Sequence, residues 1–198
     1  MKRIIILLFA LSFFSHLTRG QAQESSPHFY IELRPLQFIM DGYSIVGHYA
    51  LNETTQIGAT VFSSTLSSNV TDFIWDTEGS FSLEAKQNIV LSLSYRRFLN
   101  KAKPNQGWFV GLAAGVEYYT LTNLSNREEL DYDFYFLAPR LGHMLYPLKY
   151  KLPNFFISLE AVVVFPIITD GTANFSNGAT AEINNVLPSP LIGLGYRF

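Results

Sequence analysis

Strand-like alternation recurs along almost the whole chain, and it restricts the possible folds more than any other feature. Eight segments alternate apolar with small or polar side chains, which is typical of β-strands with two different faces. These segments are 29–39, 43–51, 55–64, 81–98, 108–121, 132–147, 155–168 and 189–198. Because no segment keeps a 3.6-residue period, the sequence predicts an all-β chain.

The composition of the two faces indicates which one points outward. One face of each segment is apolar, and the other mixes glycine, serine and alanine with one or two charges. A soluble barrel or sandwich shows the same alternation, but the small, weakly charged face would be a poor surface toward water and a good lining for a narrow lumen. We therefore expect the apolar faces, including Leu112, Leu159 and Leu194, to contact lipid.

Backbone groups in lipid must all be paired, so such a sheet has to close on itself. The sequence therefore predicts an eight-stranded antiparallel up-and-down transmembrane β-barrel. Pro35, Pro139 and Pro166 fall inside the predicted strands. Proline cannot donate to a ladder, so we expect bulges or missing hydrogen bonds at these positions.

The first twenty residues have the pattern of a secretory signal peptide. Lys2 and Arg3 precede an apolar run at 4–14, and Gly20 and Ala22 offer small residues for cleavage. The run is too short to span a bilayer as a helix, although an N-terminal membrane anchor is the alternative. The predicted organisation is a signal peptide at 1–20 (with cleavage possibly after 22), a short lead at 21–28 and one barrel at 29–198.

Charge and cysteine content exclude several classes of protein. The predicted signal carries three of the 14 basic residues, so the rest of the chain has 11 basic against 16 acidic residues, a net charge of −5. That balance argues against a nucleic-acid partner. The chain contains no cysteine, which excludes disulfides, thiolate metal sites and lipid attachment at a processed cysteine.

Loop charges divide between the two ends of the predicted barrel. The connections on one side include every long loop and hold ten carboxylates against Arg127, whereas the connections on the other side hold four lysines against Glu53. Long extracellular loops and short periplasmic turns are the arrangement expected of such barrels. The acidic side is therefore predicted to face the outside of the cell.

The last segment, "IGLGYRF", continues its alternation to Phe198, with Tyr196 two residues before it. With the export signal and the eight segments, it makes the chain resemble small bacterial outer-membrane β-barrels of the OmpA/OmpX type across 29–198. The resemblance implies that Tyr196 and Phe198 form the signal read by the outer-membrane assembly machinery. It also implies outer-membrane lipid and lipopolysaccharide as partners.

Charged side chains gather on the predicted lumen face. Opposite residues of a hairpin can be found by counting outward from the centre of its turn. With turns centred near 150–151 and near Gly178, this hairpin arithmetic places Glu160 between Arg140 and Arg197. Glu117 is assigned to the same lumen charge cluster. Two interpretations remain: a salt-bridged plug, or a path for protons or small ions. The lumen-facing set as a whole is Glu32, Arg34, His48, Glu84, Lys86, Arg96, Glu117, Arg140, Glu160 and Arg197.

Evidence for catalysis or metal binding is sparse in the sequence. Glu129, Asp131 and Asp133 are the candidates for a divalent cation in an outer loop, but their spacing is not that of an EF-hand. No serine lies within a few residues of His143, and no G-x-S-x-G turn occurs. We expect no catalytic residues, no cofactor and no metal.

Four functions remain open. The first is a non-enzymatic protein that stabilises the envelope or binds a surface partner through its acidic extracellular loops. The others are a narrow channel or conduit for small or hydrophobic molecules, a lipid-modifying outer-membrane enzyme, and a soluble lipid-binding barrel. One scaffold hosts many functions, so the fold alone does not decide among them.

Overall fold

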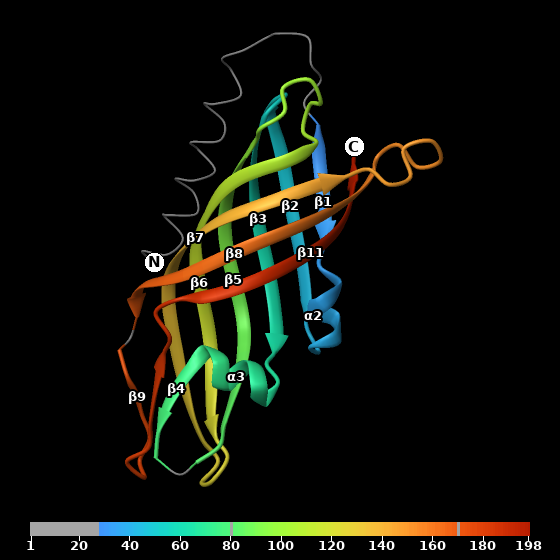
Figure 1. Cartoon of the computed structure of the whole chain (residues 1–198). Helices are drawn as coiled ribbons and strands as arrows, with labels where there is room; N and C mark the ends of the chain where they lie inside the picture. Colours follow the sequence, from blue (N-terminus) through green and yellow to red (C-terminus); the bar gives the residue numbers. More distant parts are fainter. Residues whose placement is uncertain (1–27, 80, 170) are drawn as a thin grey trace, which may run out of the picture.

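The computed structural model describes residues 28–79, 81–169 and 171–198. The predicted signal peptide, both cleavage positions and most of the 21–28 lead lie outside the described residues. No helix within the described ranges is long and apolar enough to cross a membrane. The elements, in chain order, are β1 (Phe29–Leu33), α2 (Pro35–Ile39), β2 (Tyr43–Asn52), β3 (Thr55–Thr65), α3 (Ser68–Ile74), β4 (Trp75–Glu78), β5 (Leu83–Phe98), β6 (Gly107–Asn123), β7 (Glu128–Leu145), β8 (Phe155–Thr169), β9 (Ala173–Asn174), β10 (Thr180–Ile183) and β11 (Leu187–Arg197) (Figure 1).

Eight of the strands form a closed antiparallel barrel in the order β1-β11-β8-β7-β6-β5-β3-β2 (Figure 1). Each strand pairs with its neighbours in sequence around the ring, and β11 closes it against β1. The predicted eight-stranded antiparallel up-and-down barrel is confirmed.

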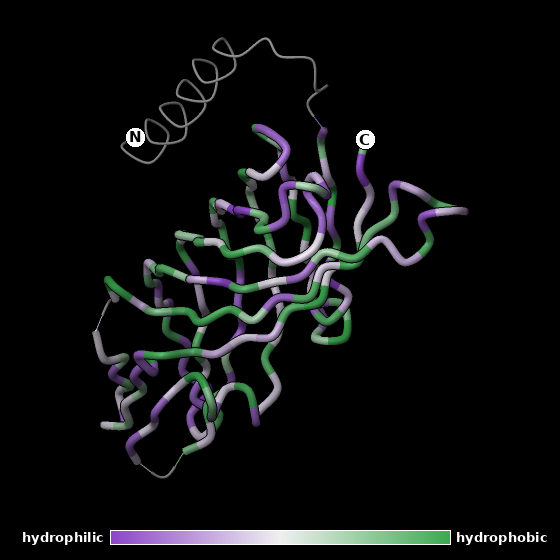
Figure 2. The backbone as a smooth tube through the Cα atoms, turned by 45° about the horizontal axis from the view of Figure 1, so that its top comes forward, coloured by the Kyte–Doolittle hydropathy of each residue, from purple (hydrophilic) through white to green (hydrophobic). Residues whose placement is uncertain are grey.

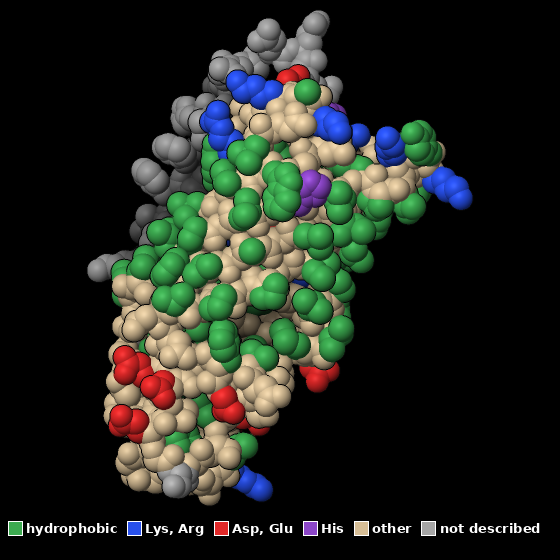
Figure 3. Space-filling view, in the orientation of Figure 1, with side chains coloured by type: hydrophobic (Ala, Val, Ile, Leu, Met, Phe, Trp, Pro, Cys, Tyr) green, Lys and Arg blue, Asp and Glu red, His purple; other side chains and the backbone are tan. Residues whose placement is uncertain are grey.

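The apolar faces point outward, as the alternation predicts. Leu112, Leu159 and Leu194 are 40–43% exposed, whereas Phe109 and Ala113 on the opposite face of β6 are buried. Hydrophobic and hydrophilic residues alternate along the strands in Figure 2. On the face shown in Figure 3, hydrophobic side chains cover the middle of the molecule, and acidic and basic side chains gather mainly at opposite ends. An exposed apolar belt between two charged ends is the surface of a transmembrane β-barrel.

A bulge in β5 corrects part of the predicted lumen face. The ladder with β6 passes from Gln87↔Tyr119 to Ile89↔Tyr118, so one extra residue reverses the alternation. On the side of the bulge toward the basic end, Ser94 and Arg96 are buried as predicted. On the side toward the acidic end, the assignment of Glu84 and Lys86 to the lumen was wrong. Those two side chains are exposed, because the bulge turns the outer part of β5 over.

The three prolines behave in two ways. Strand β1 ends at Leu33 and Pro35 begins α2, so the predicted strand 29–39 was wrong beyond Leu33. Proline suits the first position of a helix. Near Pro139 the pairing of β7 with β8 is interrupted, and at Pro166 the register shifts. The expected missing bonds and bulge are confirmed at those two positions.

The seam between β1 and β11 is the shortest ladder in the ring. It contains four residue pairs, from Tyr30↔Arg197 to Leu33↔Leu194, against 17 pairs between β6 and β7. Beyond Leu33 the place of the first strand is taken by α2, which contacts both β2 and β11 (Figure 1). On the acidic side of the seam, a helix of five residues therefore stands where the first strand would otherwise continue.

Two prolines lie on the part of the β11 edge that extends beyond its ladder with β1. The Phe198 N–H donates to the Phe29 carbonyl of β1, whereas the Arg197 N–H donates to Asn154 on the β8 side. Backbone groups alternate in direction along a regular strand, so the nitrogens of Pro188 and Pro190 point away from β8, to the same edge that pairs with β1 further along. Because proline has no N–H, this edge carries no unpaired donor at either position.

The described residues of the long loops 65–80 and 169–188 fold into a cap on the acidic end. Strands β4, β10 and β9 form a three-stranded sheet, and α3 precedes it (Figure 1). Trp75 is 1% exposed, and its ring meets Tyr132 at 4.8 Å and Tyr119 at 5.6 Å between centroids. Apolar and aromatic side chains from the cap and from the inner faces of β5, β6 and β7 thus form one buried cluster in the outer half of the barrel.

Candidate functional site

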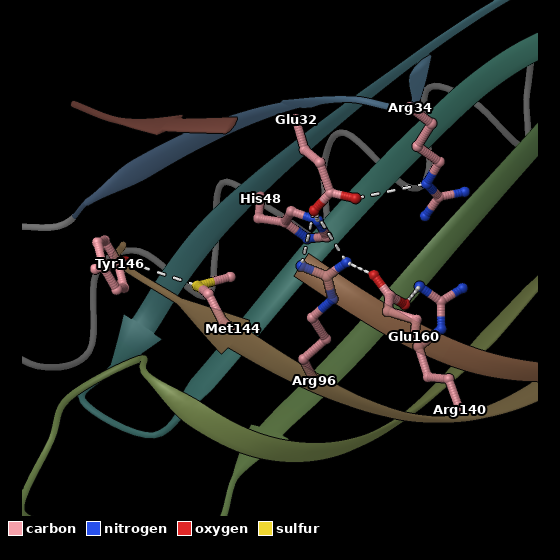
Figure 4. Close-up of polar contacts among 8 residues, drawn as sticks. All are labelled: Glu32, Arg34, His48, Arg96, Arg140, Met144, Tyr146 and Glu160. Atoms are coloured by element: carbon pink, nitrogen blue, oxygen red, sulfur yellow. Dashed lines mark hydrogen bonds and ion pairs between the residues drawn. The ribbon is translucent and has the colours of Figure 1, made fainter. Parts of the chain in front are cut away.

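Six ionisable side chains from five strands and one loop position converge in the middle of the lumen (Figure 4). Each is 7% exposed or less. We name this set the lumen ion cluster: Glu32 from β1, Arg34 directly after β1, His48 from β2, Arg96 from β5, Arg140 from β7 and Glu160 from β8.

Arg96 is the centre of the lumen ion cluster. Its two terminal nitrogens both lie 3.3 Å from Oε2 of Glu32, and Nη2 also donates to Oε1 of Glu160. The guanidinium stands 4.9 Å from the centre of the Phe109 ring, within range of a cation–π contact. One arginine on β5 therefore joins two carboxylates from β1 and β8, the two strands that flank β11 on the other side of the lumen.

Further basic side chains surround the two carboxylates. Arg140 Nη1 lies 3.1 Å from Oε2 of Glu160, and Arg34 Nε lies 3.5 Å from Oε1 of Glu32. His48 Nε2 approaches Oε2 of Glu32 to 3.7 Å. Three guanidiniums thus face two carboxylates, a near balance that lowers the cost of burying each charge.

Lumen-facing glycines make room for these long side chains. A Cβ added to Gly193 would overlap Oε1 of Glu32, and one added to Gly58 would overlap the His48 ring. At Gly111, which pairs with Arg140, an added Cβ would come within 2.9 Å of that arginine's Cγ. The small residues of the polar face therefore determine where each charge can sit.

Of the predicted lumen charge cluster, Arg140 and Glu160 are brought together, and Glu117 and Arg197 are not. Glu117 lies nearer the cap, where Gln87 Nε2 and the Tyr119 hydroxyl each donate to its Oε2 at 2.7 Å. Its donors are neutral side chains on β5 and β6, so its inclusion with the arginines was wrong.

The position predicted for Arg197 was wrong because the register was wrong. The arithmetic assumed a symmetric last loop and placed Glu160 beside Tyr196 and Arg197, whereas Glu160 pairs with Leu191. The loop folds instead as β9 and β10, which shifts the return strand. Arg197 lies at the basic end, where its Nη2 donates to Asn154 Oδ1 at 3.0 Å.

Arg96, Glu32, Arg34 and His48 were expected to face the lumen but not to join the cluster. Arg96 reaches its carboxylates across the lumen rather than along neighbouring strands. Hairpin arithmetic relates only adjacent strands, so it could not find this contact. The signal available in the sequence was the set of charges at lumen parity at similar depths in the barrel.

The candidate metal ligands lie on the outer part of β7. Glu129 and Asp131 are exposed, and Asp131 accepts a bond from Thr120 at 3.2 Å. Asp133 follows at the same parity. Within the described ranges no group of three or more histidine or carboxylate side chains is arranged to hold a metal ion.

Glu128, at the tip of the same hairpin and beyond the apolar belt, binds the cap. Its carboxylate accepts the Ser176 hydroxyl at 2.6 Å and the Ser176 N–H at 2.8 Å. The Ser176 hydroxyl and N–H hold the pKa of Glu128 below its ordinary value, because they stabilise the ionised form.

The residues of the predicted assembly signal are exposed at the end of β11. The Tyr196 and Phe198 rings meet edge to face at 5.1 Å. The Phe198 N–H is bonded to β1 at 2.7 Å, so the strand is paired to its end. Recognition of these residues by the assembly machinery stays a prediction.

His143 points outward near the basic end. Its ring meets Trp108 at 4.8 Å, and its paired residues on the two adjacent strands are Trp108 and Leu159. Neither neighbour is a nucleophile, so the geometry around this histidine favours packing at the membrane interface.

No family model matches the chain, and no curated protein matches it. Among solved structures it is similar to Ail, the attachment invasion locus protein of Yersinia pestis in complex with the heparin analogue sucrose octasulfate, at 12% identity, a TM-score of 0.42, and 87% and 95% coverage of this chain and that one. It is also similar to the N-terminal β-barrel domain of Pseudomonas aeruginosa OprF, at 12% identity and a TM-score of 0.44, covering 87% of this chain and 96% of that one. A third similar structure is a major outer membrane protein from Thermus thermophilus, at 14% identity and a TM-score of 0.49, covering 88% of this chain and 100% of that one. At these identities and TM-scores below 0.5, none of the likenesses assigns the chain to a family.

Proposed function

We propose that this chain is a non-enzymatic protein of the bacterial outer membrane. In this proposal it stabilises the envelope or binds a surface partner through its acidic end, and it does not conduct solutes. The observation that carries the proposal is the lumen ion cluster. A closed barrel with an apolar belt suits a bilayer, and charges buried to 7% exposure or less close its interior.

The two ends support the orientation. The acidic end carries the folded cap with β4, β10 and β9, whereas the basic end consists of short turns. Short turns on the periplasmic side and longer loops outside are the usual arrangement. The cap is then the part that meets the surroundings of the cell.

Insertion and orientation can be tested together on whole cells. An epitope inserted at Gly178, a turn with a φ of 82° in the cap, should be detected on intact cells. The same epitope in the 101–106 turn should be detected only after the cells are permeabilised. Detection of the second epitope on intact cells, or recovery of the protein outside the outer-membrane fraction, would refute the proposal.

The closed lumen is tested by conductance in a planar bilayer. The refolded protein should produce no current steps above the lipid baseline, because the cluster and the cap fill the lumen. Reproducible steps from pure folded protein would instead favour the narrow channel.

A further inference from the structure

A groove at the basic end has the chemistry of a lipid headgroup site. It has a volume of about 800 Å³ and lies between the β5–β6 turn and the end of β7. Its floor and walls combine apolar, aromatic and cationic side chains. The residues that matter for the argument are Leu99, Lys101, Lys103, Trp108, His143 and Leu145.

Trp108 places the groove at the edge of the apolar belt. It is 55% exposed and packs edge-on against His143, while the next outward residue on β6, Val110, is 44% exposed. Tryptophan at the end of such a belt is typical of the level of lipid headgroups. Leu145, at 39% exposure, continues the apolar surface on β7.

The charges in the groove are of one sign. Its lining contains two lysines and no carboxylate. Neither Lys101 nor Lys103 forms a salt bridge with any residue that the structure describes. The carboxylates of the surface gather mainly at the opposite end of the molecule (Figure 3). The groove therefore presents cationic charge with no internal partner, directly beside an apolar wall.

We propose that this groove binds the headgroup of an anionic phospholipid. The phosphate lies against Lys101 and Lys103, and the first part of the acyl chains lies along Trp108 and Val110. This inference rests on the membrane insertion proposed above. It selects a phospholipid over a free anion because the lysines adjoin an apolar, aromatic wall that continues into the belt.

The chain supplies its own reporter for a test. It contains two tryptophans, and Trp75 is buried in the cap, far along the barrel from the groove. A Trp75→Phe background leaves Trp108 as the fluorophore, and the unmodified chain serves if that variant folds poorly. The protein is reconstituted in phosphatidylcholine vesicles containing a minor fraction of phosphatidylglycerol. Bromine is placed on the acyl chains either of the phosphatidylglycerol or of an equal amount of phosphatidylcholine.

Trp108 should be quenched more strongly by the brominated anionic lipid. A basic residue near an anionic lipid contributes about 1 kcal/mol, which corresponds to roughly a five-fold preference per lysine. The Lys101→Gln/Lys103→Gln variant should lose this preference. The matched variant Lys149→Gln/Lys151→Gln, which removes the same charge from the other basic turn, should keep it.

The outcomes separate this inference from the proposed function. Equal quenching by the two brominated lipids, equal loss in both double variants, or loss of the preference on adding inorganic phosphate would each overturn the groove as a phospholipid site. If brominated lipids do not quench Trp108 at all, the proposed membrane insertion itself fails.

Discussion

The sector formed by β5, β6 and β7 and the seam between β1 and β11 hold the same barrel together by different means. In the β5–β7 sector the strands pair along a long hydrogen-bonded ladder, with 17 residue pairs between β6 and β7. The seam has four residue pairs, and the short helix α2 follows them on the acidic side. Yet Glu32 lies on β1 at the seam, and Glu160 lies on β8, the other neighbour of β11. Both bind Arg96, which stands on β5 in the opposite wall.

The lumen ion cluster is therefore placed where the ladder is shortest. Hydrogen bonds between strands hold the β5–β7 sector, whereas ion pairs across the lumen join β1 and β8, the two strands that flank β11, to Arg96 of that sector. The charges in this lumen therefore stabilise the closure of the ring as well as filling its interior. The contrast predicts that substitutions in the cluster act mainly on the closure of the ring.

The largest effect is expected from Arg96→Ala. The variant leaves Glu32 and Glu160 facing each other without their shared cation. Losing one partner of a buried ion pair typically costs about 3–5 kcal/mol. Urea unfolding in lipid vesicles measures this loss. Arg97→Ala is the matched control, because Arg97 is the next residue along the strand and is exposed. Similar unfolding midpoints for the two variants would show that the ion pairs do not brace the seam.

Glu160→Ala is expected to have the next largest effect. It removes the carboxylate that Arg140 binds at 3.1 Å and leaves that buried guanidinium facing Arg96. The cost should again be several kcal/mol, about 3 at the lower end, because an uncompensated buried charge remains. Leu159→Ile, on the lipid side of the same strand, should cost less than about 1.5 kcal/mol. Equal unfolding free energies would contradict the assignment of the two faces of β8.

Alternation made the barrel predictable from sequence. A period of two survives wherever a strand is regular, so the eight strands, their lipid faces and the pairing of Arg140 with Glu160 could be expected. It fails at local irregularities. The extra residue Asn88 reverses the face of the outer part of β5, and one asparagine in a strand does not by itself specify a bulge.

The cluster was harder to predict than the barrel, for a physical reason. Arg197 and Arg96 both have lumen parity, and choosing between them requires the register across a loop of about twenty residues that forms its own sheet. Contacts across a lumen also depend on the tilt of the strands, which sequence spacing does not contain. Pro35 could have been recognised as a helix start, but its position in an apolar run favoured a strand.

A smaller effect is expected where the seam meets the cluster. Gly193→Ala on β11 would press a methyl group against the Glu32 carboxylate, which has to shift from Arg96. Overpacking of this kind typically costs about 1–3 kcal/mol. Gly47→Ala is the control, because its added methyl would meet only the edge of the exposed Phe29 ring, at 3.3 Å. A larger loss of stability at Gly47 would argue against Glu32 as the tie between the seam and the opposite wall.

The smallest effect is expected at the tip of the β6–β7 hairpin, at the acidic end of the β5–β7 sector, where Glu128 binds Ser176. Because the pKa of Glu128 is lowered in the folded protein, its contribution is complete above the ordinary pKa of glutamate. The contribution is lost as the pH falls through the lowered value. The amide resonance of Ser176 should therefore keep its hydrogen-bonded chemical shift until the solution is more acidic than that ordinary pKa. Glu129→Gln, at the exposed neighbouring position, should leave the transition unchanged, whereas Glu128→Gln should abolish it. A Ser176 transition at the ordinary pKa of glutamate would mean that Glu128 does not join the cap to the β6–β7 hairpin. The cap would then add nothing through this contact to the stability of the β5–β7 sector.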